Sequence, residues 1–471
     1  MKSKITLFWP TGNVRVRDTY IYSTSSAMCS LSKILEINNF DVTVIDSSFI
    51  YPHHKFIKNP EKSFKKLIEL TENTNPDILG VGSWTTNMPF VAEFTREFKA
   101  RNPNIPIILG GYNSTYLPNE TLQILPHIDF LVRGEGEYTL LELCQKFIQN
   151  QSVSKVKGIS FRNKERKIVH TPNRPLIQNL DELPLADLES HFFFPKEARF
   201  TLSISRGCSF NCSFCSIRNV WNKERFFSPN HIIRQMKHIQ SLYPDIEMSL
   251  ECSNFLSNVL WAKKVSDLVH KNFPDAGWSF MSRVDCISKE ILSYLSKNNF
   301  QNVLIGIESI IPETITFLNK SPNPKSYLEK TLKVISFFDK FDITGELTFI
   351  IGTPNEKKAD MLRTNDFIRK LKQKNNLTLY GSPLVLYPGT ELLNMLKAGK
   401  ISIYRISEDF ILFTSVLFAN KYKHVFMTPE YYRIKNTNMS IEEFEKTLTY
   451  VYNDIRGEIK HISDVVPDFK N

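Results

Sequence analysis

Long hydrophobic runs, biased tracts and internal repeats are all missing from this sequence. The longest apolar stretch near the C-terminus, Phe410 to Ala419, is too short to cross a bilayer and is interrupted by Thr414 and Ser415. The N-terminal residues, Met1 to Trp9, run straight into Pro10-Thr11-Gly12, without the apolar core and cleavage site of a signal peptide. The sequence therefore predicts a cytoplasmic protein without a membrane partner.

Glycine and proline are too evenly spread to form a low-complexity tail. The 17 glycines and 24 prolines are distributed over 471 residues, which is enough chain for two or three domains. Net charge is +10, from 59 basic and 49 acidic residues, but the basic residues are scattered singly and form no basic arm. This pattern favours a solvated lysine-rich surface over a nucleic-acid partner.

A disulfide framework is not expected, because the seven cysteines are an odd number and no secretory signal precedes them. Three of them, Cys208, Cys212 and Cys215, fall within eight residues as C-x3-C-x2-C, directly after an expected strand at Thr201–Ser205. Three thiolates on one short loop can hold three corners of a 4Fe–4S cube. The fourth iron is then open to a small molecule.

Two other interpretations of this cluster fit the sequence less well. A structural zinc site normally has four ligands in paired spacings, and the sequence has no second C-x2-C and no H-x3–5-H pair. A thioredoxin-like dithiol would use Cys212 and Cys215 but would leave Cys208 without a role. An iron–sulfur cluster is therefore the favoured prediction.

Short apolar strands alternate with helical stretches over residues 1–150, as is typical of a parallel, doubly wound (Rossmann-like) α/β sheet. The expected strands are Ile5–Phe8, Asp41–Ile45, Ile78–Val81, Ile105–Leu109 and Phe130–Val132. Polar and glycine residues follow four of them, at the edge where such sheets bind ligands. These glycines could equally serve only to make tight turns, and the pattern alone does not decide between the two.

The rest of the chain divides into three parts. Residues 151–198 form a connector with an expected hairpin (158–161 and 167–170). Residues 199–395 contain six strand–helix units, which predict a partial (β/α)6 TIM-type barrel. Its expected strands are Thr201–Ser205, Glu247–Glu251, Trp278–Met281, Val303–Ile307, Thr344–Ile351 and Leu377–Leu386. Residues 396–471 are expected to form a small, mainly helical region that caps the substrate. It includes a predicted helix at Ile441–Arg456.

With the aromatic Phe214 before its last cysteine, the cysteine loop resembles that of the radical S-adenosylmethionine (SAM) superfamily. Segments 250–254, 282–285, 306–309, 350–354 and 387–390 resemble that superfamily's strand-end motifs, in order and position. The resemblance implies that the open iron chelates SAM and that an electron from the cluster cleaves SAM to a 5′-deoxyadenosyl radical. The SAM contacts that it implies are Phe214, Glu251, Ser253, Arg283, Glu308 and Ile351.

One segment departs from the superfamily pattern. The second-strand motif, often Gly-Gly-Glu, reads Glu251-Cys252-Ser253 here, which leaves open whether Glu251 or Ser253 meets the methionine end of SAM. Cys252 is expected to be a small packed residue, because a fourth thiolate would block the open iron.

Residues 1–150 resemble the cobalamin-binding domain that precedes the radical barrel in one large subfamily. The resemblance rests on segments 81–83, 109–111, 132–137 and 180–184. The cobalamin contacts that it implies are Thr11, Gly12, Ser83, Trp84, Thr85, Gly110, Gly111, Gly134, Glu135, Gly136 and Glu137. No Asp-x-His-x-x-Gly occurs, so the lower face of cobalt is expected to meet a non-ligating side chain. Trp84 and Thr85 are candidates, although Trp84 could instead be a packed core residue.

The combined resemblance implies a cobalamin-dependent radical SAM methyltransferase that acts on an unactivated carbon of a peptide or another secondary-metabolite substrate. An electron donor such as flavodoxin or ferredoxin is the expected partner. A cobalamin-dependent cyclase or rearrangement enzyme would differ only in its product. A tRNA methylthiotransferase is less expected, because its first domain carries three further cluster cysteines and only Cys29 and Cys144 are available here. A non-catalytic sensor would not need the run of barrel motifs.

Overall fold

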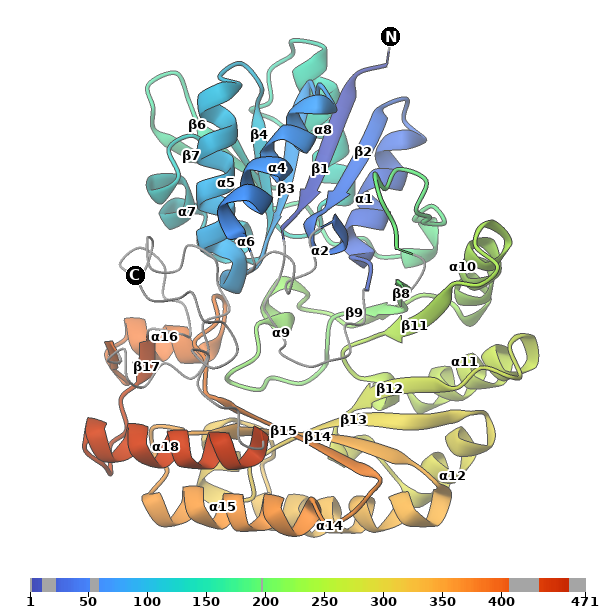
Figure 1. Ribbon diagram of the computed structural model, residues 1–471, viewed down its shortest axis with the longest axis vertical. Helices are drawn as coiled ribbons and strands as arrows, with labels where there is room; N and C mark the ends of the chain where they lie inside the picture. The colour runs from blue at the N-terminus through green and yellow to red at the C-terminus, as the bar shows by residue number, and fades with distance from the viewer. Residues whose placement is uncertain (1, 11–22, 51–58, 196–197, 406–431, 457–471) are drawn as a thin grey trace. The chain divides into compact units, whose positions relative to one another are not determined.

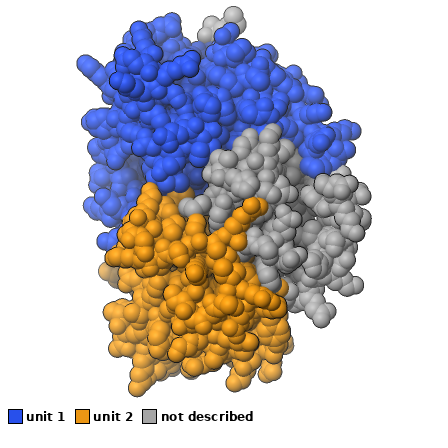
Figure 2. Space-filling model, turned by 90° about the vertical axis from the view of Figure 1, so that its left-hand side faces the viewer, with its two compact units in different colours: residues 1–207, 216–251, 413–430 blue, residues 208–215, 252–412, 431–471 orange. Residues whose placement is uncertain are grey.

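The structure, a computed structural model, describes residues 2–10, 23–50, 59–195, 198–405 and 432–456 (Figure 1). These residues form two compact units, which are coloured blue and orange in Figure 2. Unit 1 contains the described parts of 1–207 and 216–251, and unit 2 those of 208–215, 252–412 and 431–471. The chain therefore passes between the units at both ends of the cysteine loop and again after Glu251. The domain boundaries given by the sequence stay a prediction.

Unit 1 is built on a seven-stranded sheet in the order β2-β1-β3-β4-β5-β6-β7. Its strands are β1 (Lys4–Trp9), β2 (Asp41–Asp46), β3 (Ile78–Ser83), β4 (Ile107–Gly111), β5 (Phe130–Val132), β6 (Ile159–Arg162) and β7 (Ile168–His170). The first five run parallel, and the strand order reverses at β1, as in a doubly wound sheet. The hairpin expected in the connector is present as β6 and β7, and it extends this sheet with antiparallel strands.

Helices cover both faces of the parallel strands, which confirms the predicted α/β class. On one face pack α1 (Ser26–Glu36) and α8 (Glu137–Ile148), and on the other α4 (Pro60–Asn73), α5 (Met88–Arg101) and α7 (Pro118–Ile124). All six residues of β3 are buried, as expected for a central parallel strand. Short elements α2 (Ser47–Ile50), η1 (Thr85–Asn87) and α6 (Tyr112–Tyr116) follow β2, β3 and β4.

The remainder of unit 1 contains the first two strands predicted for the barrel. Strand β8 (Arg199–Ser203) pairs in parallel with β11 (Glu247–Glu251), and α10 (Pro229–Leu242) lies between them in the chain. Helix α10 begins after Ser228, whose hydroxyl accepts a hydrogen bond from the backbone amide of His231. Pro229 occupies the first turn of the helix. The short strands β9 (Ser205–Arg206) and β10 (Arg225–Phe226) pair antiparallel, and η2 (Leu180–Glu182) and α9 (Ile217–Val220) complete the unit.

Unit 2 is built on a four-stranded parallel sheet, β12 (Trp278–Ser282), β13 (Phe300–Glu308), β14 (Thr344–Ile351) and β15 (Leu377–Pro383). Its longer helices are α11 (Val259–Asn272), α12 (Lys289–Lys297), α14 (Pro324–Phe341), α15 (Lys358–Leu371) and α18 (Ile441–Arg456). Shorter elements are η3 (Phe255–Ser257), η4 (Val284–Cys286), α13 (Pro312–Phe317), α16 (Glu391–Lys397), β16 (Ile403–Arg405) and β17 (Tyr432–Ile434). All six strands predicted for the barrel thus form, two in unit 1 and four in unit 2.

Among the described helices, none combines the length and the apolar character needed to cross a membrane.

A row of phenylalanines dominates the core of unit 1. Phe90, Phe94 and Phe98 recur every four residues on α5, and each is at most 1% exposed. The ring of Phe94 stacks on that of Phe8 from β1, with the ring centroids 3.9 Å apart. This contact joins α5 to the strand at which the order of the sheet reverses.

We expect Phe94→Ala to lower the free energy of unfolding of unit 1 by about 3–5 kcal/mol, because it leaves a cavity beside a packed strand. Phe193→Ala, at a position in the same unit that is 48% exposed, is the matched control, and its effect should stay within ~0.5 kcal/mol. Urea unfolding of both variants measures the difference. Equal losses would contradict the assignment of Phe94 to the core.

Candidate active site

The loop that carries Cys208, Cys212 and Cys215 is fixed through the backbone of the residues between its cysteines. The amide of Ser213 donates to the carbonyl of Leu318 at 3.0 Å, and the amide of Leu392 donates to the carbonyl of Ser213 at 3.1 Å. The side-chain amide of Asn319 donates to the carbonyl of Asn211 at 2.7 Å. The three thiols are half-buried and form no disulfide.

This donor set fits a 4Fe–4S cluster. Three half-buried thiols lie on one loop at the C-x3-C-x2-C spacing, and a cation lies beside one of them: Nη1 of Arg283 is 3.0 Å from Sγ of Cys212. Of the other cysteines in unit 2, Cys252 is buried, as predicted, and Cys286 accepts a weak hydrogen bond from the side chain of Asn254.

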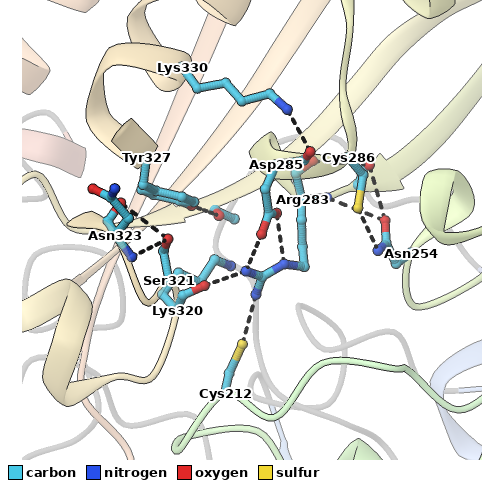
Figure 3. A network of polar contacts seen from close by, with 12 residues as sticks. Cys212, Asn254, Arg283, Asp285, Cys286, Lys320, Ser321, Asn323, Tyr327 and Lys330 are labelled. Atoms are coloured by element: carbon cyan, nitrogen blue, oxygen red, sulfur yellow. Dashed lines mark hydrogen bonds and ion pairs between the residues drawn. The ribbon is translucent and has the colours of Figure 1, made fainter. Parts of the chain in front are cut away.

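Arg283, an expected SAM contact, is held from several sides (Figure 3). Its Nε and Nη2 donate to the two carboxylate oxygens of Asp285 at 2.9 and 2.7 Å, and Nη2 also donates to the carbonyl of Lys320. The guanidinium lies over the ring of Phe210, 3.9 Å from its centroid. The strand β12 delivers this side chain, because Arg283 follows the last residue of the strand.

Glu308, a second expected SAM contact, belongs to the same network through Lys320. The ammonium of Lys320 donates to the Glu308 carboxylate at 3.0 Å, and both residues are buried. Glu308 has a φ of 67°, in the left-handed region that non-glycine residues rarely adopt, at the end of β13. The structure thus connects Cys212, Arg283 and Glu308, which the sequence placed in three separate motifs.

The remaining expected SAM contacts are less closely connected. Ile351 is fully buried at the end of β14, and Phe214 packs against the apolar cluster that contains Leu318 and Ile350. Ser253 is half-buried in unit 2, whereas Glu251 is exposed in unit 1, where the hydroxyl of Ser26 donates to its carboxylate at 3.2 Å.

In unit 1, the expected cobalamin contacts gather at the carboxyl ends of β3, β4 and β5. The hydroxyl of Ser83 donates to the carbonyl of Gly110 at 2.7 Å. Gly111 has a φ of 108°, and a Cβ there would lie 2.1 Å from the carbonyl oxygen of Ser83, so only glycine fits. Among the described residues, no atom lies within 4 Å of a Cβ built on Gly110 or on Gly134, so that part of the structure leaves these two positions of the edge open.

Aromatic side chains border this open edge. Trp84, directly after β3, is 49% exposed, and its ring meets those of Trp9 and Tyr112 edge to face. Thr85, by contrast, is buried, and its hydroxyl bonds the side chain of Asn113 at 3.1 Å. A large exposed aromatic beside open glycines fits a flat, largely apolar ligand such as a corrin. Thr11 and Gly12 lie outside the described residues.

Glu135 and Glu137, also expected at this edge, are engaged in a buried ionic cluster with two arginines. Arg206 reaches Glu135 at 2.9 Å and Glu137 at 2.5 Å, and Arg225 reaches Glu135 at 3.0 Å. All four side chains are at most 13% exposed. Burial acts to raise the pKa of Glu137, but the charge of Arg206 holds that pKa below its usual value. A contact of these two residues with cobalamin stays a prediction.

Sequence analysis assigned no role to five residues that the structure places in these networks: Lys320, Asp285, Phe210, Arg206 and Arg225. Asp285 and Phe210 stood within motifs that were already recognised, so a search of those motifs for charged and aromatic neighbours could have found them. Arg206, which precedes Gly207 and Cys208, carried the same signal. No local pattern pointed to Lys320 or Arg225, because their partners lie far away in the chain.

We expect Arg206→Met to destabilise unit 1 by about 3–5 kcal/mol, because it leaves the buried Glu137 without its cationic partner. Arg199→Met is the matched control: Arg199 pairs with Glu247, whose side chain is 71% exposed, and its loss should cost at most ~1 kcal/mol. Urea unfolding of the two variants tests this, and a loss from Arg206→Met no larger than the control would refute the buried pairing.

Two family models match the chain. One, described as the B12 binding domain, matches residues 14–144, and the other, described as the radical SAM superfamily, matches residues 202–368. A protein of Pyrococcus horikoshii named as an uncharacterised methyltransferase is 28% identical over 338 residues, which are 70% of this chain and 71% of that protein. The anaerobic magnesium-protoporphyrin IX monomethyl ester cyclase of Cereibacter sphaeroides is 25% identical over 321 residues, which are 64% of this chain and 50% of the cyclase.

A solved structure extends the likeness to nearly the whole chain. The radical SAM methyltransferase TsrM from Kitasatospora setae, with cobalamin and a 4Fe–4S cluster bound, superposes with a TM-score of 0.69. The likeness covers 98% of this chain and 90% of TsrM at 16% identity, so it establishes a shared fold.

Each of the two family models covers one of the two candidate cofactor sites. The open glycine edge lies within the residues matched by the B12 model, and the cysteine loop lies within those matched by the radical SAM model. The chain therefore joins a B12-binding domain to a radical S-adenosylmethionine domain, and its fold is that of a radical SAM methyltransferase solved with cobalamin and a 4Fe–4S cluster bound.

Proposed function

We propose that the protein transfers a methyl group from SAM, by way of bound cobalamin, to an unactivated carbon of a peptide or another secondary-metabolite substrate. The observation that carries this proposal is the presence, in one chain, of a three-thiol loop beside Arg283 and of an open glycine edge bordered by Trp84. The similarity to proteins named as methyltransferases supports the choice of reaction.

The need for two cofactors follows from the substrate. An sp3 carbon is not a nucleophile, so polar transfer of a methyl cation from SAM cannot reach it. When bound, the cluster supplies the electron that cleaves SAM to a hydrogen-abstracting radical, and cobalamin carries the methyl group. The polypeptide holds each cofactor in place and orients the substrate.

In this proposal each part of the site has a task. Cys208, Cys212 and Cys215 ligate three irons, and the backbone bonds of Ser213 keep the loop in shape. The left-handed backbone at Glu308 turns that carboxylate toward Lys320, where the pair forms a polar wall for SAM. Trp84 offers a non-ligating aromatic face to the corrin, and Gly110, Gly111 and Gly134 let the backbone approach it closely.

A cyclase is the second candidate, because the Cereibacter sphaeroides cyclase is 25% identical over 64% of this chain. A methylthiotransferase is disfavoured by the described structure. It would require further cluster thiols in the first domain, but Cys29 and Cys144 there are fully buried and burial raises the pKa of both thiols. The proposal includes a cytoplasmic location and a flavodoxin or ferredoxin as the electron donor.

We expect Cys212→Ala to abolish the reductive cleavage of SAM, because only two protein ligands would remain for the cluster. The measurement is 5′-deoxyadenosine formed from SAM and a chemical reductant by anaerobically reconstituted protein. Cys144→Ala removes a buried thiol of unit 1 and should retain the cleavage activity of the wild type. Cleavage that persists in Cys212→Ala would sink the assignment of this loop.

An experiment can distinguish methyl transfer from cyclisation before the substrate is known. Holoenzyme with reduced cobalamin is incubated with SAM labelled in its methyl group, and the corrin is then extracted in the dark. The methyltransferase proposal predicts labelled corrin. Unlabelled corrin, together with 5′-deoxyadenosine formation, would favour the cyclase.

A further inference from the structure

Arg283 makes a direct contact with one of the proposed cluster ligands. Its Nη1 donates to Sγ of Cys212 at 3.0 Å, which is short for a hydrogen bond to sulfur. Arg283 is only 7% exposed, so water scarcely competes for this bond. In Figure 3 the guanidinium stands between the Cys212 sulfur and the Asp285 carboxylate.

The guanidinium has little freedom to turn elsewhere. Two of its N–H groups are taken by Asp285, one by the carbonyl of Lys320 and one by Cys212, which together occupy four of the five donors of an arginine. Phe210, from the cysteine loop itself, supports one face of the guanidinium plane. A group fixed in this way has a single donor left for the carboxylate of a cofactor.

We infer that Arg283 sets the reduction potential of the 4Fe–4S cluster, by donating a charge-assisted hydrogen bond to the Cys212 thiolate, and that Asp285 holds it in position. This inference rests on the proposed function, since it requires the cluster on Cys208, Cys212 and Cys215. The contact of Arg283 with SAM, expected from the sequence, stays a prediction, and the bond to Cys212 gives this guanidinium a further role.

The direction of the effect follows from electrostatics. Reduction adds one negative charge to a cluster that already carries thiolates, and a nearby cation stabilises the reduced form more than the oxidised form. A donor bond to a ligand sulfur acts in the same direction, because it withdraws electron density from the metal. Arg283 therefore makes the cluster easier to reduce, which is the step that a flavodoxin or ferredoxin must drive.

The same network contains a matched control. Lys330 is also cationic, but its Nζ donates to the backbone carbonyl of Asp285 at 2.6 Å and bonds neither Cys212 nor Arg283. Lys330→Met removes one positive charge from the same neighbourhood and leaves the bond to sulfur in place. A general effect of charge would appear in both variants, and an effect of the hydrogen bond only in Arg283→Met.

The experiment is a redox titration of the reconstituted holoenzyme, followed by electron paramagnetic resonance of the reduced cluster. Iron content and SAM binding by equilibrium dialysis are measured on the same samples. In Arg283→Met we expect the ratio of reduced to oxidised cluster at a fixed potential to fall about tenfold, which is 59 mV for a one-electron couple. Arg283→Lys keeps the positive charge but loses the planar set of donors, so it should shift the ratio in the same direction by less, and Lys330→Met should stay close to wild type.

The outcomes separate the possible roles of Arg283. An unchanged potential with weakened SAM binding in Arg283→Met would overturn the inference and return Arg283 to the cofactor carboxylate. An equal shift in Lys330→Met would overturn it in favour of a general charge effect. If Arg283→Met does not retain iron, Arg283→Lys decides, and an unshifted potential there overturns the inference. A wild-type protein that binds no 4Fe–4S cluster would instead refute the proposed function.

Discussion

Three thiolates on one short loop repel each other, and the site depends on how the protein holds them together. The peptide groups of the loop are bonded to carbonyls and amides of segments more than a hundred residues away, at Leu318, Asn319 and Leu392. Positive charge is supplied separately by Arg283, whose own orientation is fixed by Asp285. The shape of the loop and the charge around it therefore come from different parts of the chain.

Buried charge has a parallel role in unit 1. Arg206 ends the strand that leads into the cysteine loop, and it is bonded to Glu135 and Glu137 at the start of α8. Those two carboxylates follow Gly134, at the edge where cobalamin is proposed to bind. The ionic cluster thus ties the segment before the cysteines to the glycine-rich turn within one unit, and removing either sign of charge would leave the other buried and unpaired.

Most of the fold could be predicted from the sequence, because local patterns determined it. The strand at Phe130–Val132 and the helix at Ile441–Arg456 have the predicted bounds, since the first is a short continuous apolar run and the second has apolar residues at helical spacing. The hairpin at 158–170 was predicted too, but not its attachment to the sheet. That attachment depends on pairing of Phe130 with Phe161, which no local pattern encodes.

The candidate site could be predicted only in part, because many of its contacts join residues that are far apart in the sequence. The cysteine spacing is local, and it identified the loop. The pairing of Glu137 with Arg206 joins residues 69 positions apart, and the bond between Arg283 and Cys212 joins residues 71 apart. Motif recognition placed Glu135, Glu137 and Arg283 near cofactors but could not show that their charged groups are already engaged by other side chains.

The most direct test of the whole account is the iron and cobalt content of the protein after strictly anaerobic purification from cells supplied with cobalamin. A cobalamin-dependent radical SAM enzyme should retain about four irons and about one cobalamin per chain. A chain that holds neither metal, even after reconstitution with iron, sulfide and cobalamin, would contradict the account.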